Sequence, residues 1–176
     1  MVRTVTLLCG TVLLAAAGLV VFPAPVHAAN TAASRDKAAI EALEARFAAA
    51  FNAKDVNAIM QLYEPGPGLF VFDAAPPRQH VGWADYKADW EDTFKAMPSV
   101  SHFSISDLTI TVVGPVAYGH SIQTGVFTGA NGSKGRFVVR VTDVYRKIHG
   151  AWLIVQEHVS VPVDLNTGQA DLLSKP

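Results

Sequence analysis

Residues 136–160 constrain the fold more than any other part of the chain. Two runs rich in β-branched and aromatic residues are separated there by His149-Gly150, and glycine readily adopts the positive φ of a tight hairpin turn. Apolar and polar side chains alternate in the first run, which is typical of a half-buried strand. Asp143 interrupts its apolar face. Because a buried carboxylate is costly unless it is paired or neutral, Asp143 either lines a cavity or has a partner.

Three segments before these strands show helical spacing of apolar residues. The first helix is expected to begin at Ser34, and its apolar face recurs at Ile40, Leu43, Phe47 and Phe51. Asp55 can cap a short second helix, and Gly82 opens a third. The apolar side of the third helix consists of Trp83, Tyr86, Trp90 and Phe94. Residues 69–72 form a short strand between the second and third helices, and residues 74–80 form a loop.

The remainder of the chain reads as four long strands, over residues 100–113, 116–128, 135–147 and 151–162. The short loops between them predict an antiparallel meander. Three helices on one face of a curved antiparallel sheet make an α+β domain. Because three helices cannot fill the concavity of a long bent sheet evenly, we expect a cone with a cavity at its open end.

The first 28 residues have the features of a secretory signal peptide. Arg3 precedes an apolar run over residues 5–22, and Val26-His27-Ala28 offers a small-x-small cleavage site. An uncleaved membrane anchor is the alternative. We expect a secreted or periplasmic protein in which residues 34–163 form the domain, residues 164–176 form a flexible tail, and no membrane association remains after signal removal.

Composition excludes several classes of function. Cys9 is the only cysteine, so a cleaved chain would have no disulfide and no thiol nucleophile. The formal net charge is −1 and no basic run exceeds two residues, which argues against binding nucleic acid or anionic lipid. The spacing of the histidines predicts no metal site, because Phe103 and Ile105 are expected to face inward and so turn His102 away. No cofactor is predicted.

Several motifs resemble those of one superfamily. They are Phe51-Asn-Ala-Lys-Asp55, Phe72-Asp73, His80-Val-Gly82, Val116-Ala-Tyr118, Arg140-Val-Thr-Asp-Val-Tyr-Arg-Lys147 and Gly150-Ala-Trp-Leu-Ile-Val-Gln-Glu-His-Val-Ser160. On these motifs residues 34–163 resemble the nuclear transport factor 2 (NTF2)-like superfamily, and within it the SnoaL-like group. SgcJ/EcaC-type sequences and the association domain of calcium/calmodulin-dependent kinase are similar, and steroid delta-isomerases are more distant. The resemblance implies a cone-shaped fold but no single activity.

The resemblance to the isomerases also implies roles for two carboxyls. Asp73 matches the position of their general base, and Asp143 matches a protonated acid that donates a hydrogen bond to an oxyanion. Phe47 stands where those enzymes carry a tyrosine donor, and losing one such donor costs about 10²–10³ in rate. The alternative role for Asp73 is to cap the following loop, and the alternative for Asp143 is to pair with a histidine or tyrosine.

Further side chains complete the predicted pocket. Strand parity turns His120 inward together with Tyr118, and the resemblance places His158 and Ser160 inward. His158 could act as an acid or base near neutral pH, or could simply orient Asp143. The alternative to a functional role for His120 is a hydrogen-bonded histidine of the core or rim. The apolar walls are expected from Tyr63, Trp90 and Phe47, which plain helix–sheet packing also explains.

Two functions fit this sequence. The first is a cofactor-free small-molecule pocket that catalyses isomerisation or cyclisation next to a carbonyl, with Asp73 as the base and neutral Asp143 or a histidine stabilising the enolate. The second is a non-catalytic ligand-binding or oligomerisation domain, suggested by Phe47 and by a basic outer face that includes Arg136, Arg140 and Arg146. A homodimer through the sheet is expected in either case.

Overall fold

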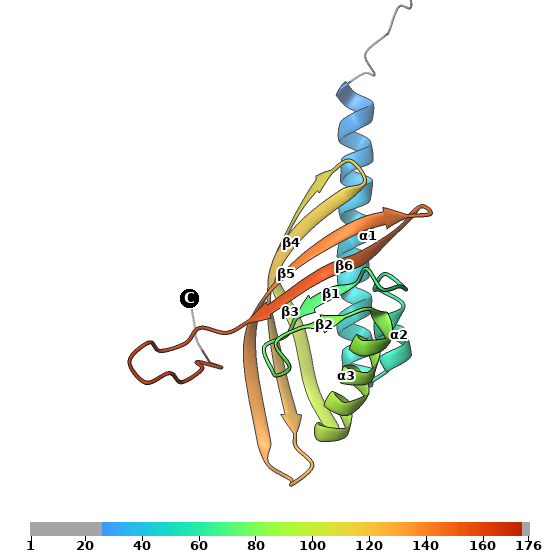
Figure 1. Ribbon diagram of the computed structural model, residues 1–176. Helices are drawn as coiled ribbons and strands as arrows, with labels where there is room; N and C mark the ends of the chain where they lie inside the picture. Colours follow the sequence, from blue (N-terminus) through green and yellow to red (C-terminus); the bar gives the residue numbers. More distant parts are fainter. Residues whose placement is uncertain (1–25, 174–176) are drawn as a thin grey trace, which may run out of the picture.

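The computed structural model describes residues 26–173, and side chains from Thr31 onward (Figure 1). Most of the predicted signal peptide, including Cys9, lies outside the described residues, so cleavage and export stay predictions. Within the described part of the chain, no helix is long and apolar enough to cross a membrane.

Three helices precede the main sheet, as the sequence predicts. They are α1 (Val26–Ala53), α2 (Val56–Met60) and α3 (Trp83–Ala96). Helix α1 begins eight residues before the expected Ser34 and ends where Lys54 adopts a φ of 54°. Asp55 caps α2 as expected, because its Oδ1 accepts a hydrogen bond from the Ala58 N–H at 2.9 Å. Helix α3 follows Gly82, which has a φ of 89°.

The sheet has six strands in the order β2-β1-β6-β5-β4-β3. Its long strands, β3 (Ser99–Val113), β4 (Val116–Thr128), β5 (Lys134–Ile148) and β6 (Ala151–Ser160), form the predicted antiparallel meander. The short strand β1 (Phe70–Phe72) pairs with β6 in parallel. It also pairs with β2 (His80–Val81), a two-residue strand that begins at the last residue of the predicted loop.

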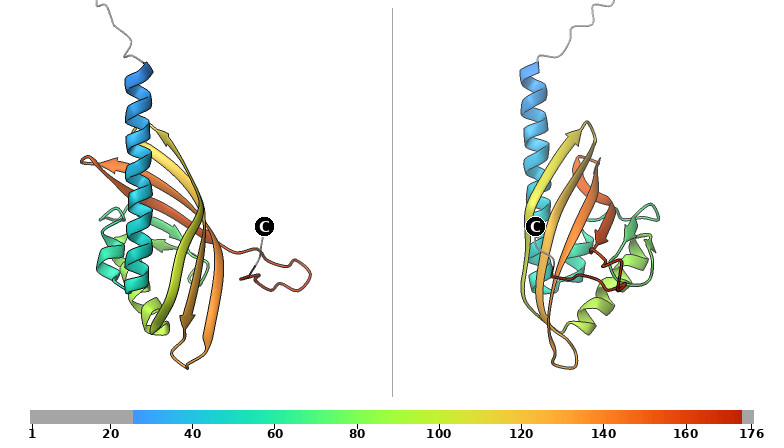
Figure 2. Two further views of the ribbon diagram at one scale, coloured as in Figure 1. Left: turned by 180° about the vertical axis from the view of Figure 1, so that it is seen from behind. Right: turned by 90° about the vertical axis from the view of Figure 1, so that its left-hand side faces the viewer.

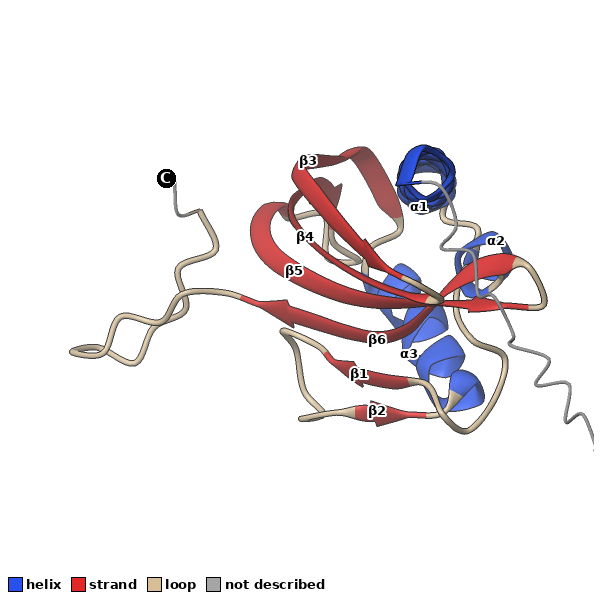
Figure 3. Cartoon of the chain, turned by 90° about the horizontal axis from the view of Figure 1, so that it is seen from above, coloured by secondary structure: helices blue, strands red, loops and turns tan. Residues whose placement is uncertain are grey.

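The long strands curve around the helices and leave the sheet open (Figure 3). One cause is the register shift in β3 between Ser106 and Thr109, where Asp107 has a φ of 52°. Such a bulge bends a strand and increases its twist. Helix α1 packs along β3, while α3 contacts β2 and lies on the concave side of the sheet (Figures 1 and 3).

Aromatic side chains fill the join between α1, α3 and β3. Phe51 stacks on Phe103 with ring centroids 3.9 Å apart, and Trp90 meets Phe51 edge-on at 5.6 Å. Asn52 fixes the end of α1 to β3, because its side chain donates to the Phe103 carbonyl at 2.9 Å and accepts from the Phe103 N–H at 2.8 Å. This join sets the position of α1 against the sheet.

The segment after β6 leaves the sheet and returns to it, which Figure 2 shows from two sides. Asp164 begins a hydrogen-bonded turn with Gln169, and Asp171 N–H donates to the Pro162 carbonyl. The Leu172 carbonyl then accepts a hydrogen bond from the Val138 N–H at 2.8 Å. Leu172 therefore reaches the rim of the concave face.

Candidate functional site

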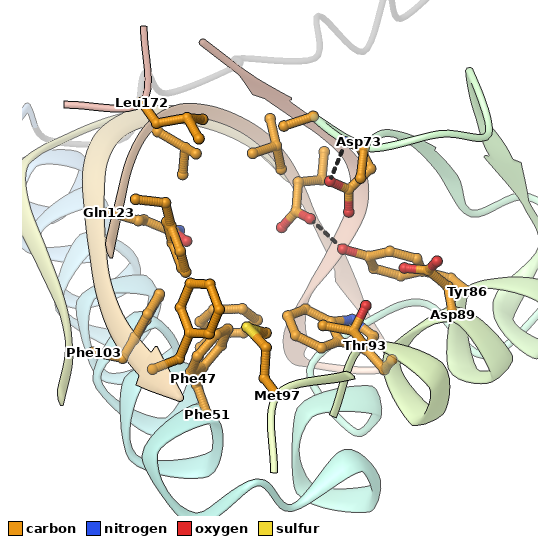
Figure 4. Close-up of a pocket in the computed structure, with 18 of the residues that line it drawn as sticks. Phe47, Phe51, Asp73, Tyr86, Asp89, Thr93, Met97, Phe103, Gln123 and Leu172 are labelled. Atoms are coloured by element: carbon orange, nitrogen blue, oxygen red, sulfur yellow. Dashed lines mark hydrogen bonds between the residues drawn. The ribbon is translucent and has the colours of Figure 1, made fainter. Parts of the chain in front are cut away.

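A cavity of about 340 Å³ lies between the concave face of the sheet and the helices (Figure 4). One wall is apolar and mostly aromatic. It is formed by Phe47, Phe51, Phe103, Phe127, Phe137 and Met97. Leu172 lies at the rim, so the returning C-terminal segment narrows the entrance. The size and lining are typical of a small-molecule site.

The opposite wall is acidic. Asp73 follows β1, Asp89 lies on α3, and Glu157 points into the cavity from β6. Among the lining residues only Arg136, which is exposed, carries a positive charge. The described residues contain no cluster of three or more side chains arranged to hold a metal ion. The acidic wall therefore favours a neutral or cationic ligand over an anionic one.

Two tyrosines hold the Glu157 carboxyl. Tyr63 donates to Oε2 at 2.7 Å and Tyr86 donates to Oε1 at 2.6 Å. Both hydroxyls and the carboxyl are buried. Burial raises the pKa of Glu157, and these two hydrogen bonds act in the opposite direction. Glu157 is thus a fixed carboxyl that holds a proton more tightly than an exposed glutamate does.

Asp143 lies behind Glu157, directly opposite it across β5 and β6. Tyr145 donates to Glu44 at 2.8 Å, and its hydroxyl oxygen lies 3.3 Å from Asp143 Oδ2. Burial, and then the charges of Glu157 and Glu44, hold the pKa of Asp143 well above its usual range. Asp143 therefore holds a proton more tightly than an exposed aspartate does, and its interaction with Glu157 acts in the same direction.

The inward position predicted for Asp143 is confirmed, but it does not line the cavity. It belongs to a second layer that supports Glu157. Asp143 interacts with Tyr145 and with the carboxyls of Glu157 and Glu44. The tyrosine matches the alternative that Asp143 pairs with a histidine or tyrosine. Asp143 therefore does not reach a ligand directly, and it can act on one only through Glu157.

Asp73 reaches the cavity as predicted, and it is half-buried. Its Oδ1 also accepts a hydrogen bond from the Ala75 N–H at 3.3 Å, so the loop-capping alternative holds at the same time. Phe47 and Trp90 line the cavity as expected. Tyr63 does not line it and instead supports Glu157 from behind.

The inward orientation expected for His158 and Ser160 is wrong. Strand β6 has a register shift in which Tyr145 pairs with Ile154 while Val144 pairs with Gln156, so Val155 is an extra residue. Because side chains alternate with a period of two, one extra residue exchanges the faces for the rest of the strand. Glu157 consequently faces inward, His158 is exposed and Ser160 pairs with the exposed Arg140.

The inward orientation expected for His120 and Tyr118 is also wrong. Both are exposed, and the buried face of β4 carries small or polar residues instead. Those residues are Ala117, Gly119, Ser121, Gln123 and Gly125. They face inward because large rings from β5 occupy the adjacent space, so that an added methyl group at Gly125 would lie 2.3 Å from the Phe137 ring.

Sequence reasoning missed three acidic residues of the site. Glu44 lies four residues after Ile40 and three before Phe47, so its place in the apolar stripe of α1 was a usable signal. Asp89 lies one residue before Trp90, and no pattern distinguishes it from the exposed Asp85 and Asp92. The alternation of side chains along β6 could not identify Glu157 as inward-facing. Both faces of the strand are apolar, so the sequence gives no sign of the bulge at Val155.

Comparison with known proteins agrees with this geometry. Residues 40–164 match the model of the SnoaL-like domain. The chain belongs to the SnoaL-like domain family. Comparison with curated proteins gives no match.

Solved structures share the fold. An NTF2-like protein of unknown function from Pseudomonas putida has a TM-score of 0.68 and 26% identity, covering 84% of this chain and 98% of its own. A ketosteroid isomerase-like protein from Erwinia carotovora atroseptica has a TM-score of 0.60 and 21% identity, covering 70% and 93%. A candidate calcium/calmodulin-dependent protein kinase type II association domain from Thiobacillus denitrificans has a TM-score of 0.59 and 20% identity, covering 70% and 94%. The SnoaL-like chain therefore has the NTF2-like cone.

Proposed function

We propose that this SnoaL-like protein is an exported, cofactor-free enzyme that moves a proton next to the carbonyl group of a small apolar molecule. The observation that carries the proposal is Glu157, a cavity-lining carboxyl that two tyrosines hold and that lies opposite the buried Asp143, whose pKa is raised. Carboxyls whose environments push their pKa values apart are the usual equipment of such acid–base chemistry.

The aromatic wall and the acidic wall of the cavity bind different parts of the substrate. An apolar ring packs on the aromatic wall, and its carbonyl group faces Glu157. Asp73 lies on the same acidic wall, and its charge acts on Glu157. Asp73 removes the proton from the carbon next to the carbonyl, while the Glu157–Asp143 pair donates a hydrogen bond to the enolate oxygen. This revises the role of Asp143 to a supporting one.

The test uses 3-cyclohexenone, whose double bond moves into conjugation when a proton is removed at C2 and returned at C4. The absorbance of the conjugated product measures the rate. We expect turnover by the wild type, and losses of about 10²–10³ in kcat for Asp73→Asn and Glu157→Gln. The control is Asp92→Asn, an exposed carboxylate of α3 outside the cavity. Equal rates in wild type and Asp73→Asn would remove Asp73 from the mechanism.

The alternative is a non-catalytic ligand-binding or oligomerisation domain. It is supported by an exposed apolar patch on the outer face of the sheet, where Tyr118 is 52% exposed and Val116 is 40% exposed. A ligand at a hundred times its Kd adds about 2.7 kcal/mol of stability to the protein that binds it. A thermal shift with 3-cyclohexenone in the absence of turnover would favour this alternative.

A further inference from the structure

His80 lies between two aspartates of α3. Its ring is buried, with Nδ1 3.4 Å from Asp85 Oδ2 and Nε2 3.6 Å from Asp89 Oδ1. The arrangement follows from the local fold. Asp85 and Asp89 are four residues apart and so share one face of α3, and β2 runs beside that face.

The two aspartates differ in their surroundings. The Asp85 side chain is 57% exposed, whereas the Asp89 side chain is 25% exposed and lines the cavity. Asp85 is also fixed in place, because its Oδ2 accepts a hydrogen bond from the Val81 N–H at 3.1 Å. The three side chains therefore form a continuous line of acid–base groups from the protein surface to the acidic wall.

Neither ring nitrogen of His80 has a hydrogen-bond partner among the described residues, and the carboxylates paired with them are those of Asp85 and Asp89. Asp85 and Asp89 are thus the groups that determine which nitrogen carries the proton. Burial raises the pKa of Asp89, and the neighbouring His80 acts in the opposite direction. The Asp73 charge also raises the pKa of Asp89, and both carboxyls line the same cavity.

We propose that Asp85, His80 and Asp89 form a proton relay between solvent and the acidic wall of the cavity. The relay serves the proton-transfer reaction proposed above and rests on it. It assigns Asp89 and His80 a role in exchanging the proton that Asp73 removes.

The proton balance is complete. The C–H bond of the substrate breaks, and an O–H bond forms on Asp73. That proton passes to Asp89, the Asp89 proton passes to His80 Nε2, the Nδ1 proton passes to Asp85, and Asp85 releases a proton to water. The same steps in reverse supply the proton that is returned to the substrate, which resets the relay without any oxidant, reductant or co-reactant.

A purely structural role for His80 predicts different behaviour. The ring also packs against Tyr86, with centroids 5.5 Å apart, so its loss could disturb the hydrogen bond from Tyr86 to Glu157. Such a disturbance would slow every proton-transfer step together. Loss of a relay instead isolates Asp73 from solvent, so that the proton removed from the substrate is returned to the same molecule.

The first measurement is the conversion of 3-cyclohexenone in D₂O, with deuterium in the product determined by NMR. We expect the wild type to place solvent deuterium in the product. In His80→Gln and Asp89→Asn, the ratio of deuterium incorporation to turnover is expected to fall by about tenfold. Asp92→Asn is the matched control and should keep the wild-type ratio. An unchanged ratio in His80→Gln would overturn the relay while leaving the proposed reaction intact.

The second measurement needs no turnover. Two-dimensional NMR of the ¹⁵N-labelled chain reports the protonation of each ring nitrogen of His80. Asp89→Asn should alter the Nε2 resonance and Asp85→Asn the Nδ1 resonance, while Asp92→Asn should alter neither. Unaltered resonances in both variants would overturn the relay whether or not the protein is an enzyme. If the variants alter the resonances but the wild type shows no turnover, the proposed reaction and the catalytic use of the relay are both overturned.

Discussion

A single buried side chain, Glu44, links the acidic cluster to α1. It is 3% exposed and accepts a hydrogen bond from Tyr145. The pKa of Glu44 is raised from its usual 4.5 to about 7, because burial and the Glu157 charge raise it by more than the Tyr145 hydrogen bond lowers it. Because the folded state binds this proton more tightly than the unfolded chain, its contribution to stability is fully present below pH 4.5 and is lost as the pH rises through 7.

We therefore expect the free energy of unfolding to be lower at pH 8 than at pH 5, with roughly 3 kcal/mol of the difference due to Glu44. Glu44→Gln keeps an acceptor for Tyr145 but cannot ionise, so its stability should change less over this range. Asp143 and Glu157, whose pKa values are also raised, should supply the slope that remains. Urea denaturation at several pH values measures the effect.

Glu41→Gln provides the control for this experiment. Glu41 lies on α1 as well, but its side chain is 52% exposed. The control should reproduce the wild-type pH dependence. A Glu44→Gln protein with the wild-type slope would show that Glu44 does not titrate between pH 5 and 8.

At the scale of elements, β4 and β5 are matched through a reciprocal exchange of glycine and phenylalanine. Gly125 lies opposite Phe137, and Phe127 lies opposite Gly135. Each ring covers the glycine across from it, with an added Cβ falling 2.3 Å from ring carbons at either glycine. Since Phe127 and Phe137 both line the cavity, the two glycines set the position of its aromatic wall.

Gly125→Ala is expected to displace the Phe137 ring and to destabilise the protein by about 1–3 kcal/mol. The displaced ring should also reduce the space in the cavity and weaken binding of 3-cyclohexenone. Chemical denaturation and a thermal-shift titration measure the two effects. Gly66→Ala is the control, because nothing lies within 4 Å of an added Cβ at that position. Equal stability of the two variants would contradict the proposed packing.

At the scale of the whole molecule, the sheet has an inner face occupied by the site and an outer face that carries apolar residues. Val113 and Tyr118 are 62% and 52% exposed, and Val116 lies opposite Val113 across β3 and β4. A patch of this kind is typical of a protein–protein contact. We still predict that a second copy of the chain packs against this outer face to form a homodimer.

Tyr118→Glu should shift the protein from dimer to monomer, because a charged side chain would have to be buried in the contact. The inner face should be unaffected, so turnover of 3-cyclohexenone per chain should persist. Analytical ultracentrifugation at micromolar concentration measures the change. His102→Glu is a suitable control, since His102 is exposed near the other end of β3. A wild type that is monomeric at this concentration would contradict the prediction.

The sequence by itself determined the elements of this protein. Apolar spacing, the Asp55 cap and the His149-Gly150 turn are local signals, and they predict the helices and the four-strand meander to within a few residues. Period-two alternation likewise predicts the burial of Asp143. These features depend on interactions between residues that are near one another in the chain.

Tertiary structure alone decided the composition of the site. One extra residue at Val155 exchanged the faces of β6, which turned Glu157 inward and His158 outward. The large rings of β5 required small residues on the inner face of β4, which left His120 exposed. Asp73, Asp89 and Glu157 line one cavity because the curved sheet brings β1, α3 and β6 around it. Register and packing between distant segments set these positions, and neither is encoded in the spacing of residues along one strand.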